Sequence, residues 1–290
     1  MIIQLLNNCL AAYVLLLLVC VALSGQVLLL RVVSLTLVAA IVAGAYGAKE
    51  ALISTGWYNP VLALFFGAVT GGAVAAIGTL PDMWFAAKGR VLGLLASLGF
   101  LKVMQGMITA STGGGVEVMP VAFSSLLPRG TFLSTPGWLI PGLVVCAFSV
   151  VVTVLLLYRT RLGNSAKAVG DNRILSTLFG VPALRIGLCV QVLGGGLAGL
   201  GGVFLAVDSG LRPDLGLATA LKAFGVLVAC RGGFGRLLLW AFAVVLLEQM
   251  SGYFWGGQIR EAAGLTFLVV ALLVQGGLQY RSVGSGRPAT

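Results

Sequence analysis

The side chains that could carry out chemistry are few in this sequence, and they do not form a catalytic set. Nucleophilic catalysis needs a base beside the nucleophile, and general acid–base catalysis needs positioned titratable groups. The chain has no histidine, and its 8 Asp and Glu residues are scattered over separate segments. Its cysteines lack the spacing of a metal site or a disulfide framework: Cys9, Cys20, Cys146, Cys189 and Cys230. We therefore expect no enzyme activity, metal or cofactor in this chain.

Glycine-rich runs at Gly113–Gly115 and Gly232–Gly235 invite a phosphate-loop interpretation. A phosphate loop also needs a Lys for the phosphates and a following Ser or Thr for magnesium. Neither run is followed by that pair. The sequence therefore predicts turns and helix-packing glycines, and a chain that does not bind ATP itself.

Three ionisable residues fall inside long apolar runs: Lys102, Lys222 and Glu248. A charge at mid-membrane costs at least about 2.5 kcal/mol, so such residues usually serve a purpose. For the two lysines, reaching toward the membrane surface and forming an ion pair are equally good accounts. Glu248 lies deeper, and we expect it to pair with a basic or hydroxyl group between helices.

The amino-acid composition indicates the class of protein to which this chain belongs. The chain has 290 residues, of which 59% are hydrophobic and 9% charged, whereas soluble domains have about 25% charged residues. We expect an all-α polytopic membrane protein, a single domain over residues 1–290 with 8 or 9 transmembrane helices. The net charge of +10 is spread singly between apolar runs, which indicates contact with anionic lipid and not with nucleic acid.

The first two apolar runs, Asn8–Leu30 and Val32–Ala48, are separated only by Arg31. They predict either two spans or one span followed by a broken helix, and this choice decides the side of the amino terminus. No Lys or Arg precedes Arg31, so we expect the first span to be retained and not cleaved as a signal peptide. Broken helices often line a solute path, and the candidate side chains there are Gln26, Ser34 and Thr36. Packing of polar groups between helices explains them equally well.

Residues 159–182 form a basic, water-compatible stretch between two apolar runs. Basic loops stay on the cytoplasmic side, which orients the chain and places its basic carboxyl terminus inside as well. Small and apolar residues recur at spacings of two to four, which predicts a short amphipathic helix or helix pair ending at Gly180 and Pro182. The stretch is either an ordinary solvated loop or a docking surface for a soluble partner. Residues 111–136, rich in Gly and Pro, predict an extracytoplasmic loop.

Small residues crowd the run from Gly194 to Gly202. Small residues four apart let helix backbones approach closely within a membrane. We therefore expect this span to pack tightly against its neighbours.

The basic stretch resembles the cytoplasmic coupling loop of the branched-chain amino acid ABC transporter permease family. The matching residues are Arg159, Arg161, Gly163, Ala168, Asp171, Gly180 and Val181. The small-residue run, the sequence Leu221–Phe224 and the turn at 232–235 are similar to further family motifs. The stretch Ser34–Tyr46 matches in part and departs at Thr36 and Leu37. Glu248 corresponds to a Glu often found in the family.

The resemblance implies a permease subunit of a bacterial ABC importer in the inner membrane, working by alternating access. Its implied partners are two cytosolic ATPases that bind ATP and Mg and dock on residues 159–182, a second permease, related or identical, and an extracellular solute-binding protein. Branched-chain or other amino acids are the expected solutes, although urea, short amides and other small solutes fit similar permeases.

Two functions from other classes stay open on the residues alone. An ion-coupled secondary transporter needs intramembrane acids to bind the ion, and Glu248 is the candidate. A membrane scaffold without transport activity is also compatible with this composition.

Overall fold

The computed structural model describes residues 2–30, 34–86, 89–121, 137–230, 233–255, 262–270 and 273. Within these residues the regular structure is helical, apart from an isolated bridge between Glu117 and Leu211. The elements are α1 (Ile2–Ser24), η1 (Gly25–Leu29), α2 (Thr36–Thr55), α3 (Pro60–Ala86), α4 (Arg90–Thr112), α5 (Leu139–Arg159), α6 (Arg161–Asp171), α7 (Arg173–Leu178), α8 (Ala183–Ser209), α9 (Leu217–Ala229) and α10 (Phe234–Trp255). Residues 262–270 are also helical.

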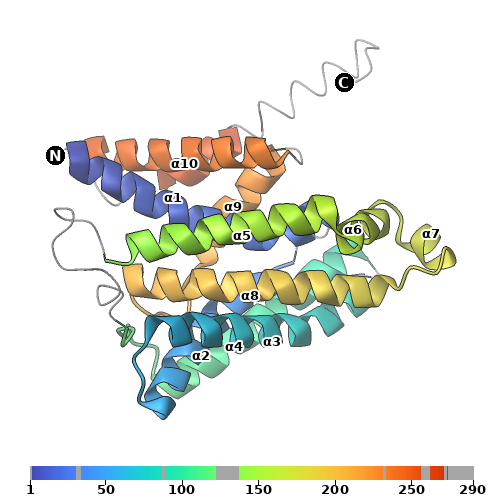
Figure 1. The fold of residues 1–290 in the computed structure, drawn as a ribbon, viewed down its shortest axis with the longest axis horizontal. Helices are drawn as coiled ribbons and strands as arrows, with labels where there is room; N and C mark the ends of the chain where they lie inside the picture. The colour runs from blue at the N-terminus through green and yellow to red at the C-terminus, as the bar shows by residue number, and fades with distance from the viewer. Residues whose placement is uncertain are drawn as a thin grey trace, which may run out of the picture.

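The long helices form a bundle, with α6 and α7 beyond one end of it (Figure 1). In the described part of the chain, 7 helices are long and apolar enough to cross a membrane. The apolar helix α9, at 13 residues, is about 20 Å long, which is shorter than the roughly 30 Å of a bilayer core. The all-α polytopic fold is therefore confirmed. We call the end that carries α6 and α7 the α6 end, and the opposite end, with residues 113–121 and 210–216, the loop end.

The break after the first span is a π-helical turn. Helix α1 continues into η1, where the amide of Leu30 donates to the carbonyl of Gly25 over 3.4 Å. Residues 4–29 together are long and apolar enough for one span, and α2, from Thr36 to Thr55, is long and apolar enough for a second. The first two apolar runs are thus two spans, and residues 31–33 between them lie outside the described residues.

The centre of the bundle is the contact among α2, α3 and α8. A Cβ atom added at Gly199 of α8 would overlap the carbonyl oxygen of Gly67 in α3, and one at Gly202 would overlap that of Ile41 in α2. One at Gly44 of α2 would overlap the Cα of Gly199. The predicted close approach at the small-residue run is therefore confirmed, because these backbones touch where side chains are missing.

The stretch 159–182 folds as the predicted helix pair, α6 and α7. Thr160 caps α6 by accepting from the amide of Gly163 at 3.3 Å, and Asn172 caps α7 by accepting from that of Leu175 at 3.0 Å. Gly180 has φ of +80°, and its amide donates to Thr177 while that of Val181 donates to Ser176, both at 3.0 Å. The expected left-handed glycine stop is confirmed.

Helix α2 runs further than the apolar run Val32–Ala48 indicated, through Lys49 to Thr55. Helix α3 contains Pro81 and continues to Ala86. Of the predicted extracytoplasmic loop 111–136, the first residues complete α4 and residues 122–136 lie outside the described residues. The carboxyl terminus, whose side was also predicted, lies outside them too.

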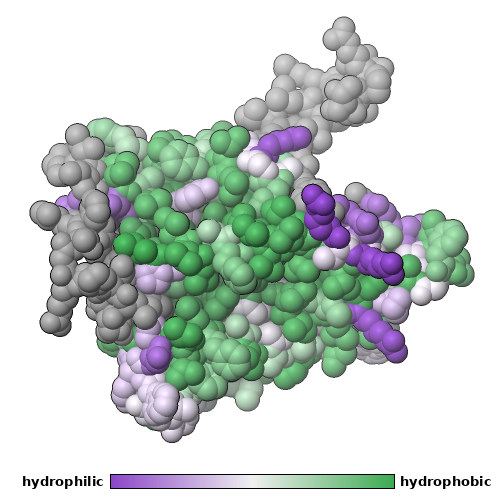
Figure 2. Space-filling view, viewed as in Figure 1, coloured by the Kyte–Doolittle hydropathy of each residue, from purple (hydrophilic) through white to green (hydrophobic). Residues whose placement is uncertain are grey.

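The hydropathy of the surface changes along the bundle. Hydrophobic residues cover the middle of the face in Figure 2, and strongly hydrophilic ones gather toward α6. This distribution is that of a protein whose middle is surrounded by lipid.

We predict that Gly199→Ala destabilises the protein, because the added methyl group meets backbone atoms of α3 that cannot rotate away. Overpacking of this kind costs about 1–3 kcal/mol. Thermal unfolding in detergent should show a lower midpoint. The matched control is Gly106→Ala in α4, where an added Cβ has no atom within 4 Å. Equal midpoints for the two variants would contradict the close contact.

Candidate functional site

Three predicted solute-path residues come together in a buried polar network at the α6 end of the bundle. The side-chain amide of Gln26 donates to the carbonyl of Ser34 at 3.0 Å, and the hydroxyl of Ser34 donates to that of Thr36 at 2.9 Å. Gln191 of α8 donates from Nε2 to Oε1 of Gln26 at 3.3 Å. All four side chains are buried. The network therefore ties η1 to the start of α2 and to α8.

One more polar residue extends this network from α4, and α3 contributes a buried acid. Asp82 is 3% exposed, and its Oδ1 has no hydrogen-bond partner in the described part of the chain. The hydroxyl of Ser97 accepts from the backbone amide of Leu35 at 3.1 Å. Sequence reasoning missed Gln191, Asp82 and Ser97. A polar residue inside an apolar run was the available signal, but nothing in the sequence indicates that these three converge.

The network forms a closed junction and not an open channel. It joins η1, the start of α2, α4 and α8 through direct hydrogen bonds. Polar groups buried in a membrane protein need such partners, because no water replaces them. Whether solute contacts Gln26, Ser34 or Thr36 stays a prediction. Their observed contacts hold the α6 end of the bundle together.

A polar cavity of about 440 Å³ lies toward the loop end, between α1, α8, α9 and α10. Its polar and charged lining is Asn8, Asp208, Ser209, Arg212, Asp214, Thr219, Lys222 and Glu248. The turn before α9 forms one wall of this cavity through Arg212, Asp214 and Gly216. The sequence did not predict this cavity, because it requires four elements to meet.

Lys222 and Glu248 form an ion pair in the wall of this cavity. Nζ of Lys222 lies 2.8 Å from Oε1 of Glu248, and the two side chains are 9% and 8% exposed. The pair joins α9 to α10. It places a basic partner beside Glu248, as expected for a carboxylate between helices. The charges offset each other in a region where either one alone would be costly.

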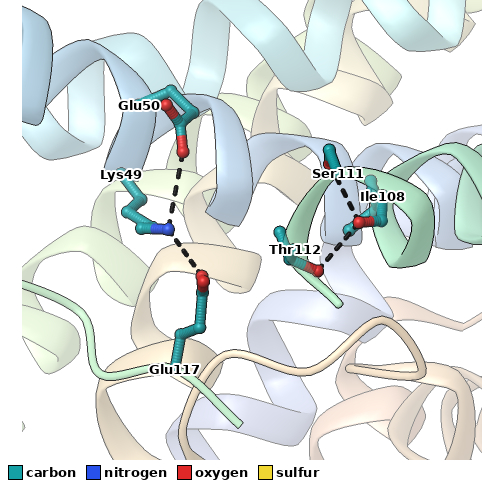
Figure 3. Close-up of polar contacts among 6 residues, drawn as sticks. All are labelled: Lys49, Glu50, Ile108, Ser111, Thr112 and Glu117. Atoms are coloured by element: carbon teal, nitrogen blue, oxygen red, sulfur yellow. Dashed lines mark hydrogen bonds and ion pairs between the residues drawn. The ribbon is translucent and has the colours of Figure 1, made fainter. Parts of the chain in front are cut away.

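A second charged cluster fastens the loop end, as Figure 3 shows. Nζ of Lys49, at the end of α2, lies 2.5 Å from Oε2 of Glu117 and 3.4 Å from Oε1 of Glu50. The backbone of Glu117 exchanges hydrogen bonds of 3.0 and 2.8 Å with that of Leu211. Glu117 therefore connects α2 to the turn that borders the cavity.

The residues predicted for the coupling loop divide into two groups on α6 and its flanks. Gly163 is buried with Ala166 and Val169 on the face that packs against the bundle. Arg159, Arg161, Ala168, Asp171 and Gly180 are exposed, and Val181 is half-buried. Helix α6 therefore lies along the end of the bundle with a small, apolar inner face and a polar outer face.

An apolar tip projects from the α6 end, where α7 stands away from the bundle in Figure 1. Leu178 and Phe179 are 78% and 79% exposed, and Leu175 is also exposed. Exposed apolar residues beyond the lipid-covered region indicate a surface that binds another protein. Sequence reasoning interpreted Leu175 and Leu178 as part of the amphipathic pattern and did not single out Phe179.

The two ends of the bundle carry different charges. The exposed charged residues at the α6 end are mainly basic: Arg159, Arg161, Lys167, Arg185 and Arg236, with Asp171. The loop end is mainly acidic: Lys49, Glu50, Glu117, Asp208, Arg212 and Asp214. This asymmetry favours a cytoplasmic α6 end. Among the residues that the structure describes, no group of three His, Cys, Asp or Glu side chains could hold a metal ion.

We predict that Glu248→Gln destabilises the protein, because it leaves Lys222 charged and buried without its partner. Removing one member of a buried pair costs about 3–5 kcal/mol. Thermal unfolding in detergent measures the loss. The surface variant Lys102→Met, which removes an exposed lysine bonded to Gln105, should change stability by less than about 0.5 kcal/mol.

The double variant Lys222→Met with Glu248→Leu separates pairing from packing. It removes both charges, so it should recover most of the stability lost in Glu248→Gln. A double variant less stable than the single one would argue that each charge has its own partner and that the ion pair is not the main interaction.

Comparison with known proteins places this architecture in a family. Residues 8–277 match the family described as branched-chain amino acid transport system / permease component. An L-arabinose ABC transporter permease protein from Azospirillum brasilense is 30% identical over 224 residues, covering 76% of this chain and 61% of that protein. An autoinducer 2 import system permease protein from Klebsiella pneumoniae is 31% identical, covering 63% of this chain and 55% of that protein.

A relative named for amino-acid transport also matches. The high-affinity branched-chain amino acid transport system permease protein of Pseudomonas aeruginosa is 25% identical over 199 residues, covering 63% of this chain and 62% of that protein. The chain thus spans less than two thirds of the length of these three relatives. The family description fits the chain over most of its length, so this protein, a multi-pass integral membrane protein, belongs to the family of branched-chain amino acid transport system permease components.

Proposed function

We propose that this protein is the permease subunit of an ABC importer in the bacterial inner membrane, with its α6 end and its carboxyl terminus in the cytoplasm. Membership of a permease family supports this function. The observation that carries it is the α6–α7 pair. One face of α6 packs on the bundle, its outer face is basic, and the apolar tip of α7 stands free.

The partners follow from the surfaces that this arrangement offers. Cytosolic ATPases that bind ATP and Mg dock on residues 159–182, with Leu178 and Phe179 entering an apolar groove. A second permease, related or identical, completes the pathway across the membrane. A solute-binding protein delivers its cargo to the loop end, where the polar cavity lies.

The transported solute is a small polyhydroxylated molecule of the sugar type. The L-arabinose and autoinducer 2 permeases among the relatives support this class. The cavity adds a chemical reason, since its Asp, Arg, Thr and Ser side chains offer both acceptors and donors for hydroxyl groups. The closed polar network at the α6 end and the cavity at the loop end correspond to the outward-facing state of an alternating-access cycle.

A branched-chain amino acid is the second candidate solute. The family description and the Pseudomonas aeruginosa relative favour it, and the apolar lining by Leu15, Leu16 and Val245 would accept an aliphatic side chain. Its charged ends would need a cation and an anion in the cavity; Lys222 is already paired with Glu248, and the lining also holds Arg212, Asp208 and Asp214. An ion-coupled secondary transporter would need an acid free to bind the ion, and Glu248 is engaged by the same pair.

Docking on the apolar tip is tested by co-purification of the ATPase with the permease. We predict that Leu178→Asp with Phe179→Asp abolishes retention of the ATPase, because two charges replace the side chains that enter its groove. Val118→Asp, at an 85% exposed residue of the loop end, is the matched control and should retain the ATPase. Uptake by proteoliposomes that contain the permease alone would instead support a secondary transporter.

The solute class is tested by uptake of labelled pentoses, hexoses and leucine into vesicles that contain the complete transporter. We predict that Thr219→Val lowers sugar uptake about 2- to 13-fold, since one lost hydrogen bond to the solute is worth about 0.5–1.5 kcal/mol. Thr109→Val, whose hydroxyl bonds its own helix away from the cavity, should leave uptake unchanged. Uptake of leucine but of no sugar would overturn the sugar assignment.

A further inference from the structure

Helix α6 touches the π-helical turn η1 backbone to backbone at Gly170. A Cβ atom added at Gly170 would overlap the carbonyl oxygen of Leu29 and lie 3.0 Å from its carbonyl carbon. Ala166 and Val169 are buried on the same face of α6. Contact between two backbones leaves no side chain that can rotate aside. A displacement of α6 toward the bundle is therefore transmitted directly to η1.

The turn η1 is suited to move because its hydrogen bonding is irregular. Its closing bond joins the amide of Leu30 to the carbonyl of Gly25, five residues earlier, at 3.4 Å. Single π-helical turns are rare and occur frequently at functional sites. Gln26 lies in this turn, so a shift of η1 also shifts the side chain that holds Ser34 and Gln191.

Space for such a shift exists beside the contact. An apolar cavity of about 50 Å³ lies between η1, α5, α6 and α8. Gly25 and Leu29 of η1, Gly163 of α6 and Cys189 of α8 are among its lining residues. A close-packed interface would resist displacement, whereas an empty apolar space on one side lets a neighbouring turn move without a steric clash.

We infer that the contact between Gly170 and Leu29 transmits the motion of the docking helices to the polar network. Movement of α6 displaces η1 and breaks the hydrogen bonds of Gln26 with Ser34 and Gln191. These bonds hold η1, α2 and α8 together at the α6 end, so their loss opens that end for release of the solute. Gly170 is thus a positioning residue that couples the ATPase to the gate. This inference rests on the proposed function.

The test is Gly170→Ala in the complete transporter, with ATPase retention, ATP hydrolysis and solute uptake measured in parallel. Gly170 lies on the inner side of α6, away from the apolar tip, so the ATPase should stay bound and hydrolyse ATP. Uptake should fall at least tenfold, because α6 can no longer seat on Leu29. The control Gly99→Ala, where an added Cβ has no neighbour within 4 Å, should keep wild-type uptake.

Two outcomes would overturn the inference. Wild-type uptake by Gly170→Ala would show that the backbone contact is dispensable, and loss of the bound ATPase would place Gly170 in docking instead of transmission. Failure of the proposed function has a different signature, because the wild-type permease would then retain no ATPase at all.

A native thiol gives a second readout that needs no substitution in α6. Cys189 lines the small cavity and is exposed, whereas Cys9, Cys20, Cys146 and Cys230 are buried. Its labelling by a membrane-permeant maleimide should change at least threefold between the nucleotide-free and the ATP–vanadate-trapped wild-type transporter. Gly170→Ala should show no such change, and Cys189→Ser gives the background. An unchanged rate in the wild type would contradict movement at η1.

Discussion

Close approach of helix backbones is the interaction on which the rest of this structure depends. Lipid tails are as apolar as Leu or Val, so no hydrophobic driving force brings helices together within a membrane. Gly44, Gly67 and Gly199 allow α2, α3 and α8 to pack at backbone distance. Dispersion contacts over these surfaces replace the missing force. The three helices therefore form a rigid centre to which the other elements attach.

Helix α8 lies in that centre and extends to both ends of the bundle, so it connects the centre to each end. Its first turns follow α7 directly and carry Gln191 into the polar network. Its last turn borders the outer cavity through Asp208 and Ser209. Glycines occupy the middle, where the helix is in contact with α2 and α3. One straight helix thus spans from the docking surface to the cavity, while the irregular turn η1 lies beside it.

Much of this fold could be predicted from local patterns, because those patterns depend on neighbouring residues only. The glycine stop at Gly180 and the close packing at Gly199 follow from the sequence and are present. The choice between one and two initial spans could not be settled, since Arg31 separates two apolar runs that a broken helix would also produce. The sequence singled out Lys222 and Glu248 separately as charges inside apolar runs. It could not show that they pair, because pairing depends on how α9 and α10 are rotated relative to each other. The outer cavity depends on four elements, and no local pattern encodes it.

The two polar features of the bundle differ in a way that determines their separate roles. In the network around Gln26, buried groups bond to one another across η1, the start of α2, α4 and α8. Such a network is stable only while all the participating elements keep their positions, since each broken bond leaves a polar group without water. In the outer cavity, polar and charged side chains instead line an open space of about 440 Å³. A bundle with its closed network beside α6 and its open cavity at the other end fits the proposed importer, in which solute enters from one side and displacement of an element that holds the network opens the other.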